Sequence, residues 1–282
     1  MISLAEIKRF AGASGVEPRI IDLDYVLSCY LHCLFNQRAV QKSWVFKGGT
    51  ALRKYYFENY RFSEDLDFTP LSKVSVSDFK DTLTSANRTI QEAIGIRSDM
   101  QEVIIDVIED EYGKESYEAR LYYQGPWNYG GSFRSIQIHV NREEFIVFPT
   151  NRLSLIHHYS DKADLPKATG QVYSLEEIMT EKLRAFSGQR KHAIPHDIFD
   201  IYHLSTKRIN LESVRKAFPE KCRAKGFCFE KIHLENIIVR KNIYETNWKS
   251  NLEYLIPHNL KVPFEIAWNV AILHLKRILK ME

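Results

Sequence analysis

Two aspartates, Asp65 and Asp67, stand two residues apart in the short run Asp65-Leu-Asp-Phe68. On a β-strand, residues two apart point to the same face and lie about 6.6 Å apart along the chain. Two carboxylates would then converge on one small volume, and carboxylate oxygens are ligands that Mg²⁺ prefers. The spacing therefore predicts a divalent-metal site on this strand.

A group of residues suited to bind phosphate precedes these aspartates. The apolar run Trp44–Phe46 leads into Gly48-Gly49-Thr50, after which the pattern becomes helical. Glycine leaves space for a bulky anion, and a helix start offers free N–H groups beside the Thr50 hydroxyl. We expect this turn to hold a polyphosphate bridged by metal to the aspartates, as phosphoryl and nucleotidyl transfer require. The alternative is a plain turn beside a solvated strand end, because each motif alone is common.

The order of these motifs resembles a known enzyme superfamily. Gly49-Thr50, fourteen intervening residues and Asp65-Leu-Asp67 are similar to the signature of DNA polymerase β-like nucleotidyltransferases. The longer strings that begin at Lys47 and at Arg61 resemble the AbiEii/MenT nucleotidyltransferase toxins of bacterial toxin–antitoxin and phage-defence systems.

This resemblance implies a function and a set of site residues. It implies transfer of NMP from an NTP to an RNA acceptor, with the tRNA 3′ end as the expected acceptor. It also implies Mg²⁺ or Mn²⁺ as cofactor and a cognate antitoxin protein as partner. The metal would lie on Asp65 and Asp67, which are also catalytic. The nucleotide would lie on a set of residues along the two strings: Lys47, Gly48, Gly49, Thr50 and Ser63.

A second constellation lies in the C-terminal half, where Glu181-Lys182-Leu-Arg-Ala185 is followed by Arg190, Asp197 and Asp200. The resemblance implies that Lys182 contacts the nucleotide phosphates and that Asp197 completes the catalytic site. An ammonium would neutralise charge on the leaving pyrophosphate, and Arg190 would add a bidentate phosphate contact. Acidic residues at a helix N-terminus are also favoured by the helix dipole, which competes as an explanation for Asp200.

The source of a third metal ligand is open in the sequence. Many polymerase β-like enzymes add a third carboxylate from a later strand, but the run Ser135–Val140 offers Gln137 and His139 instead. His139 could be a ligand, a proton shuttle or a partly buried strand histidine. Asp106 is an alternative ligand, since an acid inside an apolar strand is costly unless it is paired or metal-bound.

A basic segment follows in the helical half and carries only two acids, Glu212 and Glu220. It could form a groove for an RNA backbone or be a solvated helix face. The resemblance favours RNA, with Lys207, Arg208, Arg215 and Lys216 as contacts and with Lys221, Arg223 and Lys225 extending the segment.

Composition indicates an ordinary folded protein. The chain has 282 residues and a formal net charge of +3, which is too small to imply nucleic-acid binding by itself. The four cysteines lack tight spacing, and no signal peptide or apolar run of membrane-spanning length is present. We therefore expect a cytoplasmic protein that does not bind membranes.

The expected architecture is an α/β nucleotidyltransferase domain with a mixed sheet and helices over residues 1–160, followed by a mainly α-helical domain over residues 161–282. The segment Asn151–Gln171 is the expected joint, and the helical domain is expected to complete the active site and the acceptor cleft. Helices are predicted over 18–36, 77–94 with Ser77 as cap, 174–186 with a capping box, 195–204, 211–224, the 230s and 263–279. Strands are predicted over 103–108, 117–123, 135–140 and 144–148.

Two other functions remain open beside nucleotidyl transfer to RNA. The missing third carboxylate suits a catalytically silent scaffold that binds RNA or a partner protein. The same chemistry could also act on a protein hydroxyl or on a small molecule.

Overall fold

The computed structural model describes residues 1–98, 102–109, 115–127, 130–189 and 192–280. They divide into two compact units. The first unit comprises residues 1–143, 150–172 and 257–260, and the second comprises residues 144–149, 173–256 and 261–282. The expected joint, Asn151–Gln171, instead contributes two strands to the sheet of the first unit.

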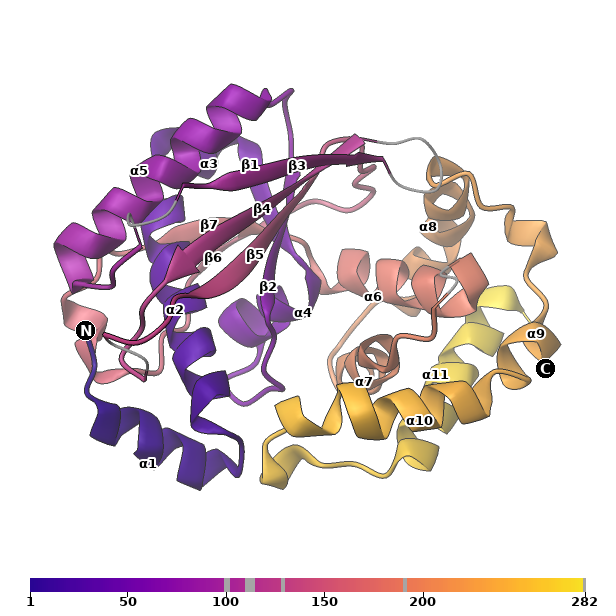
Figure 1. Cartoon of the computed structure of the whole chain (residues 1–282). Helices are drawn as coiled ribbons and strands as arrows, with labels where there is room; N and C mark the ends of the chain where they lie inside the picture. The colour runs from indigo at the N-terminus through magenta and orange to yellow at the C-terminus, as the bar shows by residue number, and fades with distance from the viewer. Residues whose placement is uncertain (99–101, 110–114, 128–129, 190–191, 281–282) are drawn as a thin grey trace. The chain divides into compact units, whose positions relative to one another are not determined.

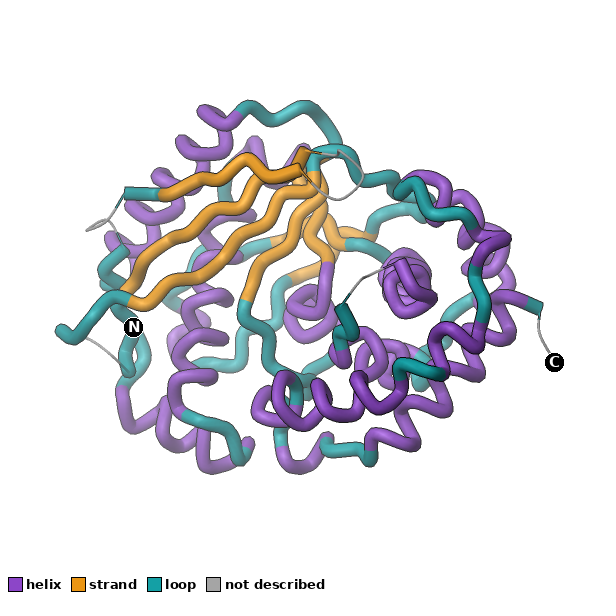
Figure 2. The backbone as a smooth tube through the Cα atoms, turned by 45° about the vertical axis from the view of Figure 1, so that its right-hand side comes forward, coloured by secondary structure: helices purple, strands orange, loops and turns teal. Residues whose placement is uncertain are grey.

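The first unit is built on a seven-stranded mixed sheet with the order β3-β4-β5-β2-β1-β7-β6. Figure 2 shows its strands side by side as one twisted sheet. β2 pairs parallel with β5 and β1 parallel with β7, and the remaining neighbours are antiparallel. The strands are β1 Trp44–Lys47, β2 Asp65–Pro70, β3 Ile104–Glu109, β4 Glu115–Tyr123, β5 Arg134–Asn141, β6 Asn151–Ser154 and β7 Thr169–Val172.

The helices of this unit are α1 Leu4–Ser14, α2 Pro18–Phe35, α3 Arg38–Ser43, α4 Gly48–Ala51 with a π-helical continuation Leu52–Tyr56, and α5 Val76–Ile94, with 3₁₀ turns at Ser160–Ala163 and His258–Leu260. The long helices α2 and α5 begin and end close to their predicted limits. The cap of α5 is Ser75 rather than Ser77, because the Ser75 and Asp78 side chains bond each other's backbone N–H groups.

One face of the sheet is apolar and carries α2 and α5 (Figure 1). The Phe35 ring of α2 packs on Phe46, and the Phe79 ring of α5 packs on Trp44. Trp44 and Phe46 are two residues apart, so they share that face, and Phe68 of β2 joins them. Alternation along the strands therefore sends the polar residues at odd positions 47, 65 and 67 to the opposite face.

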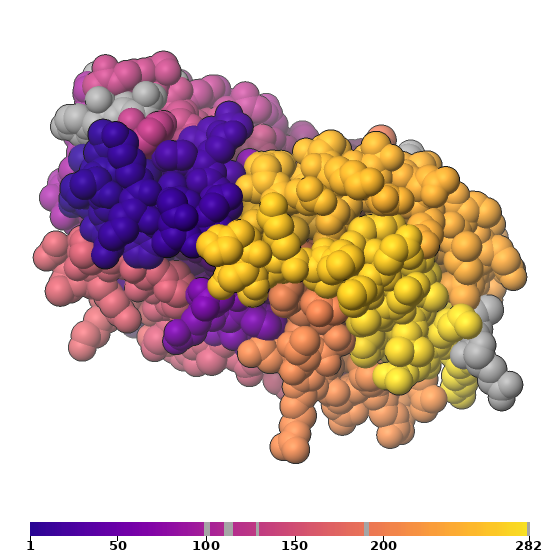
Figure 3. Space-filling view, turned by 90° about the horizontal axis from the view of Figure 1, so that it is seen from below, coloured from indigo at the N-terminus to yellow at the C-terminus, as the bar shows by residue number. Residues whose placement is uncertain are grey.

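The second unit has only helices among its described regular elements. They are α6 Leu175–Arg184 with a π-helical continuation Ala185–Gln189, α7 Pro195–Leu204, α8 Leu211–Ala224, α9 Leu234–Ile238, α10 Lys241–Asn251, α11 Phe264–Leu279 and short 3₁₀ turns at Phe229–Lys231 and Glu253–Leu255. α7 packs against α6, α10 and α11. Figure 3 shows α10 and α11, orange to yellow, on one continuous surface of this unit. Every helix in the described ranges is too short or too polar to span a bilayer.

The predicted strand over 144–148 is wrong, and a buried charge cluster explains why. Val147 and Phe148 donate their N–H groups to the Glu177 carboxylate at 2.9 and 2.7 Å, and Phe145 O accepts from Lys221 Nζ at 2.6 Å. These backbone groups are therefore satisfied by side chains rather than by a neighbouring strand. Ser174 caps α6 as predicted. The predicted capping box does not form, because the Glu177 carboxylate accepts from Val147 and Phe148 instead of from the backbone of Ser174.

Candidate functional site

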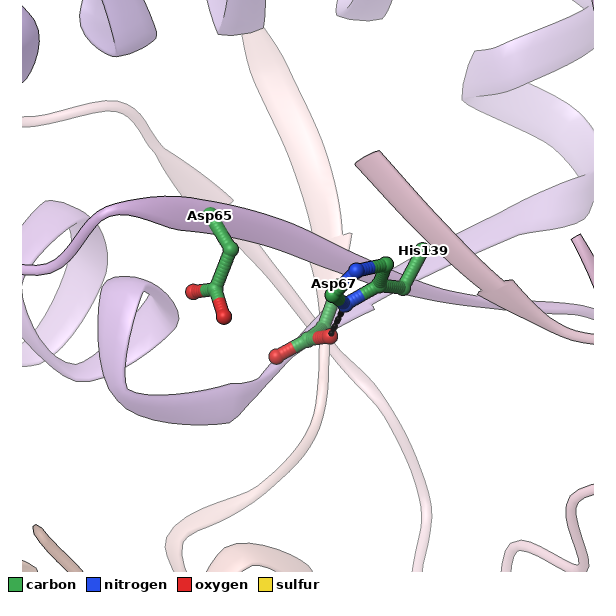
Figure 4. Close-up of side chains that lie close together, drawn as sticks. All are labelled: Asp65, Asp67 and His139. Atoms are coloured by element: carbon green, nitrogen blue, oxygen red, sulfur yellow. Dashed lines mark hydrogen bonds and ion pairs between the residues drawn. The ribbon is translucent and has the colours of Figure 1, made fainter. Parts of the chain in front are cut away.

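Asp65 and Asp67 lie on the polar face of β2 beside His139 of β5. The parallel pairing of the two strands sets Asp65 opposite Gln137 and Asp67 opposite His139. His139 Nδ1 lies 3.2 Å from Asp67 Oδ1, and one ligand atom from each of the three side chains falls within 4.8 Å of the others (Figure 4). The hydrogen bond to Asp67 raises the pKa of the His139 imidazole, and the charges of Asp65 and Glu118 add to it. All three side chains are half-buried, so a small ligand can reach them.

Asp106 is not part of this group, contrary to one expectation. It lies on the edge strand β3, and β4 and β5 separate it from β2, three strand spacings or about 14 Å away. Its strand is exposed to solvent, so the carboxylate bears no burial cost that a metal would have to relieve. The strand pairing identifies His139 as the third side chain.

The diglycine turn lies directly against Asp67 and Arg61. Gly48 has φ +80°, and a Cβ there would stand 2.4 Å from Asp67 Oδ2. A Cβ on Gly49 would stand 2.1 Å from Arg61 Nη2. A side chain at either position would displace the Asp67 carboxylate or the Arg61 guanidinium, and the positive φ of Gly48 also favours glycine, a cause that the sequence alone did not reveal.

The other predicted nucleotide-binding residues of this unit adjoin the same turn. Lys47 lies opposite Asp67 across the β1–β2 pair, so it shares the polar face. The Thr50 hydroxyl donates to Asp65 O at 2.7 Å, and Thr50 is buried, so its proton holds β2 rather than pointing to a phosphate. Ser63 Oγ accepts from Arg61 Nη1 at 3.1 Å, which directs the serine proton elsewhere. Arg61 therefore belongs to the candidate site, although the sequence motif that begins at this residue predicted no role for it.

A buried ionic network fixes the chain on both sides of the turn. Asp24 of α2 accepts from Arg53 Nε at 2.7 Å and lies 2.9 Å from Lys54 Nζ. Arg53 also donates to Tyr60 O at 2.6 Å and lies over the Phe62 ring. Burial alone would raise the pKa of Asp24, but the two cations hold it well below its usual range. The network ties the helix after the diglycine to the segment that leads into β2.

We expect Gly49→Ala to impair nucleotidyl transfer without unfolding the protein. The new methyl group would displace the Arg61 guanidinium, and a shift on the order of 1 Å beside reacting groups can cost about 100-fold in rate. The matched control is Gly12→Ala in α1, where a Cβ meets nothing within 4 Å. Steady-state transfer rates compare the two, and a Gly49→Ala enzyme as active as the control would show that this contact is not needed.

The second unit brings Lys182, Asp197 and Asp200 together. Lys182 Nζ lies 2.9 Å from Asp197 Oδ1 and 2.8 Å from Asp200 Oδ2, and both carboxylates are buried. Asp200 therefore pairs with the same lysine as Asp197. The helix dipole, which the sequence offered as an explanation for Asp200, is not its only stabilising interaction. Arg190 lies outside the described residues.

The predicted basic surface is smaller than the sequence indicated. Lys221 and Lys225 turn inward, where Lys221 Nζ lies 2.6 Å from Glu177 and Lys225 Nζ lies 3.0 Å from Glu144. The exposed Lys216 pairs with Glu212 one helical turn away. Lys207, Arg208 and Arg223 are exposed, and Arg215 of α8 lines a hollow together with Arg277 of α11. Arg277 lies far from the basic segment in sequence, so only packing reveals it.

A buried Ser–His–Asp series in the first unit has another role. His157 Nδ1 lies 2.9 Å from Ser28 Oγ, and its Nε2 lies 3.0 Å from Asp161 Oδ1. All three side chains are buried, and Tyr25 also donates to Asp161. A nucleophile without access to substrate cannot react, so this series fixes α2 against the segment around residue 160.

The fold is shared with solved structures of known proteins. The fold is similar to MenT4, a nucleotidyltransferase toxin from Mycobacterium tuberculosis, with a TM-score of 0.64 at 18% identity over 100% of this chain and 91% of that one. It is also similar to JHP933 from Helicobacter pylori, with a TM-score of 0.54 at 18% identity over 94% of each chain. At these identities the likeness concerns the fold. A search of curated protein sequences finds no match.

The family model described as nucleotidyl transferase AbiEii toxin, type IV toxin–antitoxin system, matches residues 30–270. The chain therefore belongs to the AbiEii family of nucleotidyltransferase toxins, and it is a nucleotidyltransferase. That family comprises toxins of toxin–antitoxin pairs, which implies a cognate antitoxin for this chain.

Proposed function

We propose that this protein transfers NMP from an NTP to the 3′ end of an RNA, with tRNA as the first acceptor to test, in a reaction that requires Mg²⁺ or Mn²⁺. The observation that carries the proposal is the group of Asp65, Asp67 and His139 beside the Gly48–Gly49 turn. Two carboxylates and an imidazole fit a divalent cation by donor type and spacing. This third side chain supports metal-dependent chemistry over a catalytically silent scaffold.

The proposed reaction is an in-line displacement at the α-phosphorus of the NTP. The acceptor hydroxyl oxygen forms the new bond, the bond to the bridging β-phosphate oxygen breaks, and pyrophosphate leaves with that electron pair while the hydroxyl proton passes to a base or to water. A bound divalent cation would neutralise phosphate charge and polarise the phosphoryl oxygen. In this proposal Asp65 and Asp67 hold the cation, the Gly48–Gly49 turn admits the phosphates, and Lys47 and Arg61 supply positive charge.

Lys182 is proposed to bind the leaving pyrophosphate, with Asp197 and Asp200 as its positioning residues. The two buried carboxylates hold the ammonium in one place, so little ordering cost remains for a phosphate contact. Lys182→Met should then lower the rate of transfer. Asp200→Asn should do so more mildly, because Asp197 still holds the lysine.

The RNA is proposed to bind through cations of the second unit that solvent can reach. These are the exposed Lys207, Arg208 and Lys216, the half-buried Arg215, and Arg277 from its shared hollow with Arg215. Phosphate contacts of this kind give a binding affinity for RNA that decreases as the salt concentration rises. The reaction itself takes place at the 3′ end of the RNA.

We expect Arg215→Glu with Arg277→Glu to weaken tRNA binding and to flatten its salt dependence. Each lost phosphate contact lowers the slope of log affinity against log salt by roughly 0.7 to 0.9. The matched control is Lys241→Glu with Lys249→Glu, since both lysines are paired with acids on or beside α10. Filter binding over a range of salt concentrations measures the slope, and an unchanged slope in the arginine pair would place the RNA elsewhere.

The test of the proposed acceptor is transfer of labelled NMP, from each of the four NTPs, to a tRNA pool. Periodate oxidation of the terminal ribose serves as the acceptor control. Wild-type protein should label intact tRNA and spare oxidised tRNA, and Asp65→Asn should label neither. Labelling of oxidised tRNA, or of the protein alone, would contradict a 3′-hydroxyl acceptor.

Expression without the antitoxin should arrest growth for the wild type and not for Asp65→Asn.

A further inference from the structure

His139 stands where a metal ion held by Asp65 and Asp67 would need a third protein ligand. The strand pairing puts its side chain on the same face as Asp67, directly alongside it. Divalent metals bind donors at about 2.1 Å, so donors on one ion lie up to about 4.2 Å apart. The three ligand atoms lie within 4.8 Å of one another, so small side-chain rotations would close the set around an ion.

The two ring nitrogens of His139 face different partners. Nδ1 faces Asp67 Oδ1 at 3.2 Å, so this nitrogen lies on the side of one of the two proposed carboxylate ligands. Nε2 faces Glu118 Oε2 at 3.9 Å, and Glu118 lies directly opposite on β4. A metal-ligating histidine commonly directs its other N–H to a carboxylate, which fixes the ring and raises its basicity. At 3.9 Å the Glu118 carboxylate is too far for that hydrogen bond in this structure, and a side-chain rotation would have to bring it closer.

We propose that His139 is the third protein ligand of the metal held by Asp65 and Asp67, and that its imidazole makes the site select Mn²⁺ over Mg²⁺. The inference rests on the proposed metal-dependent function and adds the identity of a ligand and of the preferred ion. Mg²⁺ prefers oxygen donors in near-ideal octahedral geometry, whereas transition metals gain from an imidazole nitrogen. A set of two carboxylates and one imidazole therefore favours a transition metal more than three carboxylates would.

The test uses metal binding without nucleotide. Mn²⁺ and Mg²⁺ affinities are measured by titration, and pulsed electron paramagnetic resonance of bound Mn²⁺ detects a coordinated ¹⁴N nucleus. The wild type should show ¹⁴N coupling, and His139→Gln and His139→Asp should lose it. The preference for Mn²⁺ over Mg²⁺ should fall by about tenfold or more in His139→Asp, since even outer-shell partners of metal ligands change affinity by 10–100-fold.

Two controls separate the outcomes. His233→Asp changes an exposed histidine of the second unit and should leave coupling and preference unchanged. Asp65→Asn should abolish Mn²⁺ binding. If Asp65→Asn abolishes binding but the wild type shows no ¹⁴N coupling, or His139→Asp keeps the wild-type preference, then His139 only orients Asp67 and the inference fails alone. If Asp65→Asn binds Mn²⁺ like the wild type, the metal lies elsewhere and the metal-dependent function fails with it.

Discussion

Replacing Asp67 by asparagine is expected to lower nucleotidyl transfer by roughly 10³-fold while leaving the fold intact. A divalent ion contributes several kcal/mol to stabilisation of a phosphoryl transition state, and about 4 kcal/mol corresponds to a factor of that size. Asparagine keeps the shape of the side chain and can still bond His139, but it loses the negative charge. Because the Asp67 side chain is 25% exposed and is not a core residue, stability should change little.

The measurement is single-turnover transfer with saturating NTP and Mn²⁺ or Mg²⁺, beside a thermal melt of each protein. Asp81→Asn serves as a surface control, because that carboxylate lies on the exposed side of α5. An Asp67→Asn enzyme that retains more than a tenth of the wild-type rate would remove Asp67 from the metal site.

Replacing Lys221 by methionine is expected to destabilise the protein by about 3–5 kcal/mol, the cost of breaking a buried ion pair by removing one partner. Lys221 is 1% exposed and lies within 2.6–3.7 Å of three carboxylates, those of Glu144, Glu177 and Glu181. Its loss would leave the buried Glu177 carboxylate without this counter-ion, although Glu144 keeps Lys225, and would release Phe145 O. Denaturant unfolding followed by circular dichroism measures the change.

The matched control is Lys216→Met, where the pair with Glu212 is exposed and screened by solvent, so the unfolding midpoint should barely move. Lys221→Met with Glu177→Gln should recover part of the loss, because one buried charge is then removed. A Lys221→Met protein as stable as the control would show that the cluster is not balanced by this lysine.

The same cluster has a defined pH dependence. Burial alone would lower the pKa of Lys221, but Glu181, Glu144 and Glu177 raise it above its ordinary value. The charged Lys221 therefore contributes fully to the free energy of unfolding below the unfolded-state pKa of about 10.4. This contribution is lost as pH rises through the higher pKa of Lys221 in the folded protein. Near neutral pH the free energy of unfolding should not depend on this group.

Local patterns predicted much of the secondary structure and the position of both aspartates in the candidate site. The two-residue spacing of Asp65 and Asp67 was enough to put both carboxylates on one strand face. The predicted helices 18–36, 195–204 and 211–224 match α2, α7 and α8 closely. The strands β6 and β7 were missed, because each has only four residues and their stretch contains the turn-forming Pro166 and Gly170.

What the sequence could not supply was pairing across long separations. Nothing local distinguishes His139 from Asp106 as the neighbour of Asp67, since the register of β2 with β5 decides it. Lys221 and Lys225 were predicted to belong to a basic surface. Their glutamate partners lie 40 or more residues away in sequence and outside α8, so no local pattern indicates that the two lysines are buried. Arg61 gains its role from the position of Gly49 in space.

Nucleotidyl transfer at the Asp65–Asp67 site can be tested by comparing NTP labelled at the α-phosphorus with NTP labelled at the γ-phosphorus. The α label should enter the RNA with release of one pyrophosphate per event, and the γ label should appear only in pyrophosphate. Both signals should fall by roughly 10³-fold in Asp67→Asn. Transfer of the γ label to the acceptor would instead show a phosphotransferase. Transfer of the α label by Asp67→Asn at the wild-type rate would contradict the assigned site.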